Sequence, residues 1–240
     1  MSTACFPKQN QVLAAVPEDC YARLLPDLER IGMPLGKVLH ESVTDLSHIY
    51  FPTTSIVSLL QVMDDAACTG IAMVGSEGLV GLALFIGGAA TPNRAVVQSA
   101  GEGYRIKSGL MRGEIDRAGP VLDLLLIHTK ALIAQLVTTA ECNRRHSLEQ
   151  RFCVWLLSTL DRQPSKQIGI TQELLAEVLG ARLESMCVLV GELVGDGLIR
   201  HSDQWIQVCE RSEVEARACE CYALLTTEVD RLLTRAMQSE

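Results

Sequence analysis

Cysteine is the residue type with the widest range of possible chemistry in this chain of 240 residues. Nine cysteines occur, an odd number, scattered at positions 5, 20, 68, 142, 153, 187, 209, 219 and 221. Several lie in apolar runs such as residues 153–156 (CVWL), a setting typical of reduced, buried cytosolic thiols. Cys219 and Cys221 suggest zinc, but no second closely spaced pair of ligands accompanies them, so we expect no metal site.

The five histidines, at positions 40, 48, 128, 146 and 201, lie far apart in the sequence. His128 falls within an apolar helical pattern, where a histidine is more often a hydrogen-bonded interface residue than a catalyst. Neither a phosphate-binding Gly-Lys loop nor the Gly-x-Ser-x-Gly turn of a serine hydrolase occurs. The sequence therefore does not predict an enzyme.

A second group of residues has the spacing of a DNA-binding motif. Thr171 is a good N-cap for a helix with its apolar residues on one face, and Gly180 can adopt the left-handed conformation that ends it. A second helical pattern restarts shortly afterwards and stops at Gly197. Residues 198–208 then form two short apolar runs around a polar turn, as in a hairpin. This order predicts a winged helix-turn-helix.

The start of the second helix carries side chains that can contact DNA. Arg182 can donate to guanine, Glu184 can accept from the amino group of cytosine, and Ser185 can contact a phosphate. With positions in the first helix and the hairpin, the predicted DNA-binding residues are Thr171, Gln172, Arg182, Glu184, Ser185 and Arg200.

Other elements must position this domain. From about Val38 to Ile106, short apolar runs alternate with glycine clusters, which predicts an all-β roll or barrel. Residues 18–31 have apolar side chains at helical spacing and predict a short helix at one end of the roll. Pro120 can begin a long helix, since no further Pro or Gly follows until Pro164.

The helix predicted to begin at Pro120 has apolar residues on more than one face, which indicates burial against both the β-domain and a second copy of itself. Leu125, Leu132 and Thr139 keep the seven-residue step of a coiled coil. Burial of the helix within a monomer is the alternative. The pattern restarts after residues 143–146 and predicts another helix.

Length and composition indicate two domains, since nearly half of the residues are apolar and can fill two cores. The net charge is -8, whereas isolated nucleic-acid-binding domains are usually basic, so any DNA contact must come from a local patch. The N-terminus lacks a signal-peptide pattern, and the longest nearly uncharged apolar stretch, Gly78 to Ala90, is shorter than the roughly 20 residues that span a bilayer. We expect a soluble, cytoplasmic protein.

Short motifs occur in a fixed order along nearly the whole chain: residues 50–52 (YFP), 74–81 (VGSEGLVG), 97–98 with Gly101, 143–151, 171–180, 197–200 (GLIR) and 219–222 (CECY). In this order they resemble the Crp/Fnr family of bacterial regulators. The resemblance implies an α+β fold with an N-terminal double-stranded, jelly-roll-like β-roll of the cyclic-nucleotide-binding type. The domains that it implies are the β-roll at 1–118, a dimerisation helix at 119–145, a winged helix-turn-helix at 146–222 and a C-terminal helix at 223–240.

The same resemblance implies the partners. A homodimer would place one recognition helix in each half of a palindromic operator in double-stranded DNA, since a single short helix reads too few bases. An activator would also contact RNA polymerase, although no residue marks such a surface. We expect no cofactor and no membrane partner.

The effector site departs from the family pattern. Nucleotide-binding members hold the ribose with a glutamate after a glycine turn and the cyclic phosphate with an arginine further on. Here Leu82 follows Gly81 at the glutamate position, and Asn93 stands at the arginine position with Arg94 beside it. A leucine leaves the ribose hydroxyl unpaired, at about 1 to 3 kcal/mol. Binding of cyclic AMP is therefore not expected, and these four residues are candidates for a different effector pocket.

The cysteines depart as well. Iron-sulfur members carry an N-terminal cysteine cluster, whereas this chain has only Cys5 and Cys20 there, too few for a cluster that normally needs four thiolates. Cys68, beside residues 69–70 in a predicted turn, is the candidate for redox sensing, which requires a lowered thiol pKa.

The charge of the recognition region leaves two hypotheses open. Residues 171–210 hold two basic and seven acidic side chains, which is unusual for a domain that displaces counterions from phosphates. Residues 143–167 hold five basic and two acidic ones, which either contact the DNA backbone or form a solvated face. The first hypothesis is a DNA-binding regulator that senses an unidentified signal. The second is a family member that has lost most DNA affinity and binds a ligand or a protein partner.

Overall fold

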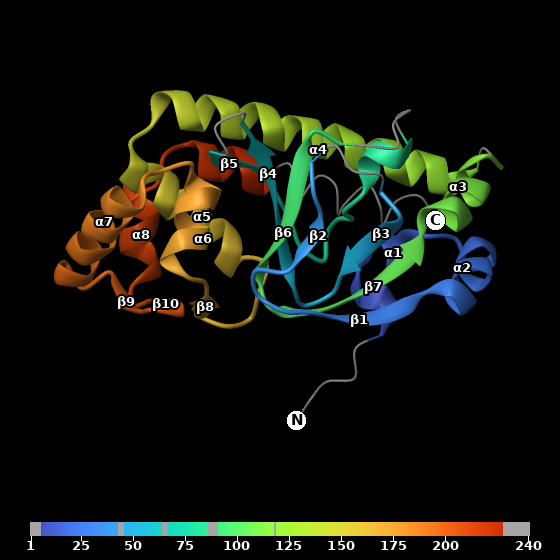
Figure 1. The fold of residues 1–240 in the computed structure, drawn as a ribbon, viewed down its shortest axis with the longest axis horizontal. Coiled ribbons are helices and arrows are strands. Elements are labelled where there is room, and N and C mark those ends of the chain that lie inside the picture. Colours follow the sequence, from blue (N-terminus) through green and yellow to red (C-terminus); the bar gives the residue numbers. More distant parts are fainter. Residues whose placement is uncertain (1–5, 43–45, 64–66, 86–90, 118, 228–240) are drawn as a thin grey trace.

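The computed structural model describes residues 6–42, 46–63, 67–85, 91–117 and 119–227. Figure 1 shows an elongated molecule in which a β-rich N-terminal half and a largely helical C-terminal half lie side by side along one long helix, α4. The expected combination of β-roll, long helix and C-terminal winged helix-turn-helix is confirmed.

Two antiparallel sheets build the described part of the N-terminal roll. One has the strand order β1-β7-β3 and the other the order β2-β6-β4-β5. Side chains from both sheets pack together between them. The strands are β1 (Glu29–Met33), β2 (Val38–His40), β3 (His48–Pro52), β4 (Ile56–Val62), β5 (Cys68–Val74), β6 (Asn93–Ser99) and β7 (Gly101–Lys107).

Strand β4 is apolar over most of its length because both of its faces are covered. Val57 and Leu59 lie in the core between the two sheets. Ile56 and Leu60 belong to a different core, which the C-terminal half fills. A strand with one face in water would instead alternate apolar and polar residues. Apolar residues on both faces of β4 are therefore explained by the packing of the two halves against each other.

The helix predicted over residues 18–31 is shorter than expected. α2 covers Glu18–Leu24, the short turn η2 covers Leu25–Asp27, and Glu29 already belongs to β1. Pro26 explains the early end, because it has no amide hydrogen for an α-helical bond. The other short helices of this half are η1 (Pro7–Gln9), α1 (Gln11–Ala15), η3 (Leu82–Phe85) and α3 (Ser108–Ile115).

Helix α4 (Pro120–Arg145) begins with Pro120 in its first turn, as predicted. The seven-residue step from Leu125 faces inwards, because Leu125 is buried in the N-terminal core and Leu132 packs against it. The exposed stripe lies one position further on, at Leu126, Ile133 and Val137, whose side chains are 57%, 55% and 60% exposed. An exposed apolar stripe of this kind is typical of a surface that another molecule buries.

The same helix is long and apolar enough to cross a membrane by length and composition. It has 26 residues, and its most apolar window has a mean hydropathy of 1.6 with 17% of the window buried. The sequence expectation missed this stretch because Lys130 interrupts it. Since one side of α4 packs on the roll, the composition also fits a helix that pairs with a second copy.

The C-terminal half contains the predicted motif. Its elements are α5 (Leu148–Leu160), β8 (Gln167–Gly169), α6 (Gln172–Leu179), α7 (Leu183–Gly195), β9 (Ile199–Ser202), β10 (Trp205–Val208) and α8 (Arg211–Arg217). A capping box between Ser147 and Gln150 starts α5. The predicted hairpin is present as β9 and β10, and β8 extends it to the sheet order β8-β10-β9. The sequence does not predict β8, since three residues are too few for a recognisable pattern.

The two halves share one apolar core. Ile56, Leu60 and Met73 of the four-stranded sheet pack with buried side chains of α5, α6 and α7. Helix α6 lies directly on β5: a Cβ atom at Gly70 would stand 2.3 Å from the carbonyl oxygen of Val178. Glycine is therefore required at position 70 for this approach.

We expect Gly70→Ala to loosen the packing of α6 on β5. The added methyl group overlaps a backbone atom, and overpacking of this kind typically costs about 1 to 3 kcal/mol. Gly32→Ala is the matched control, because a Cβ there meets nothing within 4 Å. Urea denaturation of both variants measures the difference. Equal free energies of unfolding would contradict the docked arrangement.

Candidate functional site

The turn between α6 and α7 has the backbone geometry of a helix-turn-helix. The hydroxyl oxygen of Thr171 caps α6 by accepting from the backbone N–H of Leu174 at 3.3 Å. Gly180 has φ 58° and ψ 41°, the left-handed conformation in which glycine ends a helix. Arg182 is the N-cap of α7, which begins at Leu183. The expected cap and glycine turn are both present.

Helix α7 presents its N-terminal end to solvent. Arg182, Glu184 and Ser185 are exposed, whereas the opposite face is buried in the shared core by Met186, Leu189, Val190 and Leu193. A guanidinium, a carboxylate and a hydroxyl on one exposed helix end can bind base edges or phosphates. Two apolar side chains share this end, since Leu183 and Val188 are 40% and 62% exposed.

Gln172 links three elements of the domain. Its Nε2 lies 3.1 Å from Nε2 of His201 in β9, and its Oε1 accepts from Sγ of Cys187 in α7 at 2.7 Å. The side chain thus holds the wing and α7 relative to the start of α6. Cys187 and His201 were not predicted. Cys187 is three positions after the exposed Glu184 and could have been found by helical spacing, whereas no local pattern relates His201 to Gln172.

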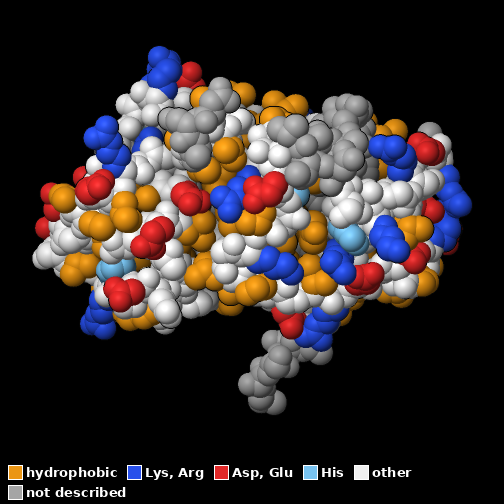
Figure 2. Space-filling view, viewed as in Figure 1, with side chains coloured by type: hydrophobic (Ala, Val, Ile, Leu, Met, Phe, Trp, Pro, Cys, Tyr) orange, Lys and Arg blue, Asp and Glu red, His pale blue; other side chains and the backbone are white. Residues whose placement is uncertain are grey.

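Few cations lie around this exposed end. Arg182 and Arg200 are exposed, and within the described ranges neither forms an ion pair. Around them Glu173, Glu184 and Glu192 are exposed. In Figure 2 the end of the molecule formed by α7 and the wing shows mainly acidic and apolar side chains with few basic ones.

The basic residues upstream are largely engaged within the protein. Arg151 donates to the carbonyl oxygen of Leu179 at 2.8 Å, at the end of α6. Arg162 is buried in an ion pair with Glu77. Arg144 and Arg145 both contact Glu141, at 3.0 and 2.6 Å. The excess of positive charge over residues 143–167 therefore contributes less to the exposed end than its count implies.

Among the described residues, the four candidate effector residues lie in different surroundings. Leu82 is buried in the N-terminal core, next to Gly81 with φ 109°. At the start of β6, Oδ1 of Asn93 accepts from the Thr91 hydroxyl at 2.9 Å. Arg94 lies between two carboxylates, 3.5 Å from Glu41 and 3.8 Å from Glu177 of α6. Arg94 thus links the roll to the helix-turn-helix.

Cys68 lies beside this group, and its pKa is raised by burial and by Glu177, although Arg94 opposes the shift. A raised pKa is the opposite of what a redox-sensing thiolate needs.

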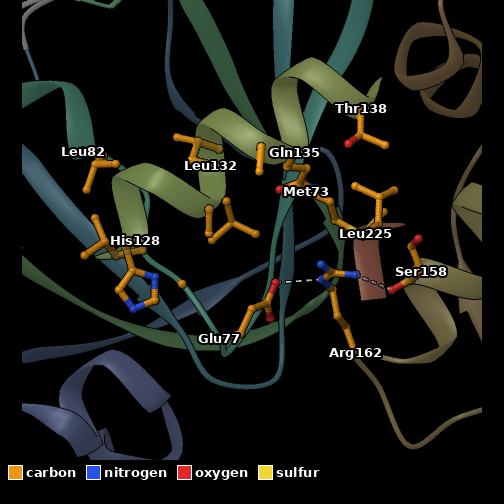
Figure 3. A pocket seen from close by; sticks show the side chains of 15 residues that line it. Met73, Glu77, Leu82, His128, Leu132, Gln135, Thr138, Ser158, Arg162 and Leu225 are labelled. Carbon is orange, nitrogen blue, oxygen red and sulfur yellow. Dashed lines mark hydrogen bonds and ion pairs between the residues drawn. The ribbon is translucent and has the colours of Figure 1, made fainter. Parts of the chain in front are cut away.

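The structure instead forms a pocket between residues 73–82 and α4, shown in Figure 3. Leu82 and Leu132 line its apolar side, and His128, Glu77 and Arg162 are among its polar groups. Burial lowers the pKa of His128 to about 4, so its imidazole is neutral near pH 7 and can hydrogen-bond a ligand without adding charge.

Glu77 and Arg162 form an ion pair between the two halves. Nε of Arg162 donates to Oε1 of Glu77 at 2.7 Å, and a second guanidinium nitrogen donates to the carbonyl oxygen of Ser158 at 2.8 Å. The side chain of Arg162 is 10% exposed and that of Glu77 is 11% exposed. Burial alone would raise the pKa of Glu77, but Arg162 and the N–H of Gly75 outweigh it, so the pKa is lowered and the carboxylate is charged.

A buried polar network joins the same two halves. Gln98 of β6 accepts from the Ser58 hydroxyl and from Nε1 of Trp155, the latter at 3.1 Å, and donates to the Thr159 hydroxyl at 3.0 Å. Because each of these groups is paired, the interface tolerates polar atoms within an apolar core.

We expect Arg162→Met to destabilise the protein by about 3 to 5 kcal/mol, since it leaves the Glu77 carboxylate buried without its cation. Adding Glu77→Gln should recover part of that loss, because the uncompensated charge disappears. Lys8→Met, which removes an exposed pair with Glu18 and the contact of the ammonium with the Tyr21 ring, is the control and should cost much less. Chemical denaturation of the two single variants and the double variant measures the coupling between Arg162 and Glu77. If the losses in free energy of unfolding were additive, the expected coupling would be absent.

Residues 150–217 match the family model described as the Crp-like helix-turn-helix domain. The matched range contains α5, both helices of the motif, the wing and α8. No curated protein sequence matches the chain.

Solved structures with this fold include proteins from three bacteria. A Crp/Fnr-family transcriptional regulator from Eubacterium rectale has a TM-score of 0.70 and 13% identity, covering 88% of this chain and 98% of that chain. FixK2 from Bradyrhizobium japonicum has a TM-score of 0.67 and 13% identity, and the match covers 80% of this chain and 98% of that chain. The c-di-GMP responsive global regulator CLP of Xanthomonas campestris has a TM-score of 0.64 and 17% identity, and the match covers 80% of this chain and 99% of that chain.

At such identities the likeness to solved structures concerns the fold. The chain has the fold of these proteins and carries a Crp-like helix-turn-helix domain at residues 150–217. Two of these solved proteins are described as regulators.

Proposed function

We propose that this protein is a homodimeric, sequence-specific DNA-binding transcription regulator of the Crp/Fnr type. The observation that carries the proposal is the exposed N-terminal end of α7, where Arg182, Glu184 and Ser185 lie in a domain of the matching family. The side chains at this end are exposed to solvent, and the four-stranded sheet of the roll packs on α6. The role implies a cytoplasmic protein and, for an activator, contact with RNA polymerase.

A second candidate function has an observation in its favour. Seven acidic side chains against two basic ones over residues 171–210, with exposed Leu183 and Val188, would suit a surface that binds another protein. Under this alternative the fold is kept and DNA affinity is weak.

The dimer would form through α4. Between Asp123 and Ala140, its exposed positions follow alternating steps of three and four residues, the spacing of a coiled-coil seam. They are Asp123, Leu126, Lys130, Ile133, Val137 and Ala140. Lys130 is a polar residue in the middle of the stripe, and such a residue specifies register at some cost in stability. A second copy of α4 would cover the stripe and bring two α7 helices to one operator.

We expect Ile133→Asp to weaken the dimer by a factor on the order of 100, because it places a charge at the centre of the seam in both copies. Leu25→Asp is the control, since Leu25 is 45% exposed in η2, outside α4. Sedimentation of both variants over a range of concentrations measures the dissociation constant. An unchanged dimer in Ile133→Asp would exclude this face as the interface.

The signal would be received in the pocket beneath α4. Its cavity volume is about 60 Å³, below the roughly 300 to 1,000 Å³ of small-molecule sites, so a ligand would have to widen it. Leu82 lies in its wall and Arg94 is engaged with Glu177, so the pair of residues that would bind ribose and cyclic phosphate is missing. A ligand there would touch Glu77 and Arg162, and through them the contact between the two halves.

Selection of random-sequence duplex DNA by the purified protein tests the proposal. The expected result is a two-fold symmetric motif of roughly 14 to 22 base pairs with half-sites about one helical turn apart. The logarithm of affinity should fall linearly with the logarithm of salt concentration. A folded dimer that enriches no motif at low salt would favour the second candidate function.

Within the selected operator, we expect Arg182→Ala to weaken binding more than Glu184→Ala. A lost guanine contact costs about 1 to 3 kcal/mol, whereas removing Glu184 also removes repulsion from phosphates. Glu184→Ala should therefore change base preference and raise non-specific affinity. Glu213→Ala, an exposed acidic residue of α8, is the control. Unchanged base preference in Glu184→Ala would show that this carboxylate does not read bases.

A further inference from the structure

Four potential metal ligands meet where α4 ends. Cys142 lies in the last turns of α4 and His146 is its C-cap, while Cys219 and Cys221 follow α8. One ligand atom from each of these residues lies within 4.8 Å of all the others. The three cysteines are buried and the histidine is 14% exposed at its side chain.

The fold creates the second ligand pair that local spacing does not reveal. Cys142 and His146 stand four residues apart at the end of a helix, so their side chains project from the same face. The backbone N–H of His146 still donates to the carbonyl oxygen of Cys142 at 3.0 Å, which keeps that face intact. The packing of α8 on α5 brings Cys219 and Cys221 back to this point.

Two of the separations between ligand atoms match those around a single tetrahedral ion. Zinc bonds of about 2.3 Å to sulfur and 2.0 Å to nitrogen place two sulfurs about 3.8 Å apart, and a sulfur and a nitrogen about 3.6 Å apart. Sγ of Cys142 lies 3.6 Å from Sγ of Cys219, and Sγ of Cys221 lies 3.6 Å from Nδ1 of His146. Ligand atoms this close enclose one ion and leave no room for a cluster with several irons and bridging sulfides.

The histidine is oriented as in metal sites. Nδ1 faces the sulfurs, and Nε2 lies 3.4 Å from the carboxylate of Glu220. A metal-bound histidine usually donates its other ring N–H to a carboxylate, which fixes the tautomer and the ring orientation. Glu220 stands between the two C-terminal cysteines, so the same short segment supplies two ligands and this partner.

The surroundings can accept the charge of such a centre. Three thiolates, one neutral imidazole and a divalent ion carry a net charge of -1. Arg151 interacts electrostatically with Cys142, and its buried Nε has no hydrogen-bond partner within the described part of the chain. The rest of the wall is apolar, with Val154, Ala218 and Leu225 around the sulfurs.

We propose that Cys142, His146, Cys219 and Cys221 bind one Zn²⁺ ion. Three soft thiolates and an imidazole in a closed tetrahedron suit zinc and leave no position for substrate, as in structural sites. The ion would join the end of α4 to the segment after α8, and so hold the DNA-binding domain at a set angle to the dimerisation helix. The metal site does not depend on the effector pocket or on the base-reading residues.

Metal content of the untagged full-length protein tests the site. After dialysis against a weak chelator, we expect about one equivalent of zinc per chain by mass spectrometry of the metals. Exchange with Co²⁺ should give the strong visible bands of a tetrahedral ion with thiolate ligands. Absence of zinc together with a Cys142–Cys219 disulfide in peptides from the unreduced protein would overturn the proposal, as would an octahedral Co²⁺ spectrum.

Variants separate a metal site from a merely structural cluster. Cys219→Ser should lose the zinc, whereas Cys209→Ser, at an exposed cysteine outside the cluster, should keep it. The Glu220 side chain is exposed, so Glu220→Gln should leave the fold intact. Because Glu220 acts on the metal through His146, we expect zinc affinity to fall about 10- to 100-fold in this variant. Glu213→Gln should leave the affinity unchanged. Equal zinc affinity in Glu220→Gln and Glu213→Gln would overturn the role of Glu220, and retention of zinc by Cys219→Ser would overturn the site.

Discussion

The burial of the four-stranded sheet on both faces is the constraint on which the rest of this structure depends. One face of β4 fills the roll and the other meets α5 and α6, with Gly70 permitting backbone contact. Within that contact, Gln98 pairs several polar groups, and Glu77 forms an ion pair with Arg162. Since unpaired polar atoms would be costly there, the docked position of the DNA-binding domain is specific rather than a general apolar attachment.

Helix α4 connects the regions that regulation would couple. Its inner face closes the pocket that contains His128, its outer face carries the apolar stripe with Ile133, and its end supplies Cys142 and His146. The pocket also contains the Glu77–Arg162 pair that joins the halves. A ligand that contacts this pair differently in two arrangements would shift their populations, which is the physical requirement for allosteric control.

Charge limits how DNA could be held. Arg151 and Arg162 are engaged inside the protein, and the exposed end of α7 keeps Arg182 among acidic side chains. Few phosphates could then be neutralised by each subunit, so affinity would depend on two-fold symmetry and on base contacts more than on counterion release.

Local patterns determined the strands around residues 49–62, the helix start at Pro120 and the turn at Gly180, because backbone chemistry and periodicity act over a few residues. Only the tertiary structure decided that the exposed stripe of α4 lies one position beyond Leu125, and that Arg94 faces the helix-turn-helix. The cysteine cluster is the clearest case. Cys142 and Cys219 stand 77 residues apart, and only the return of the chain over α5 brings them within 3.6 Å.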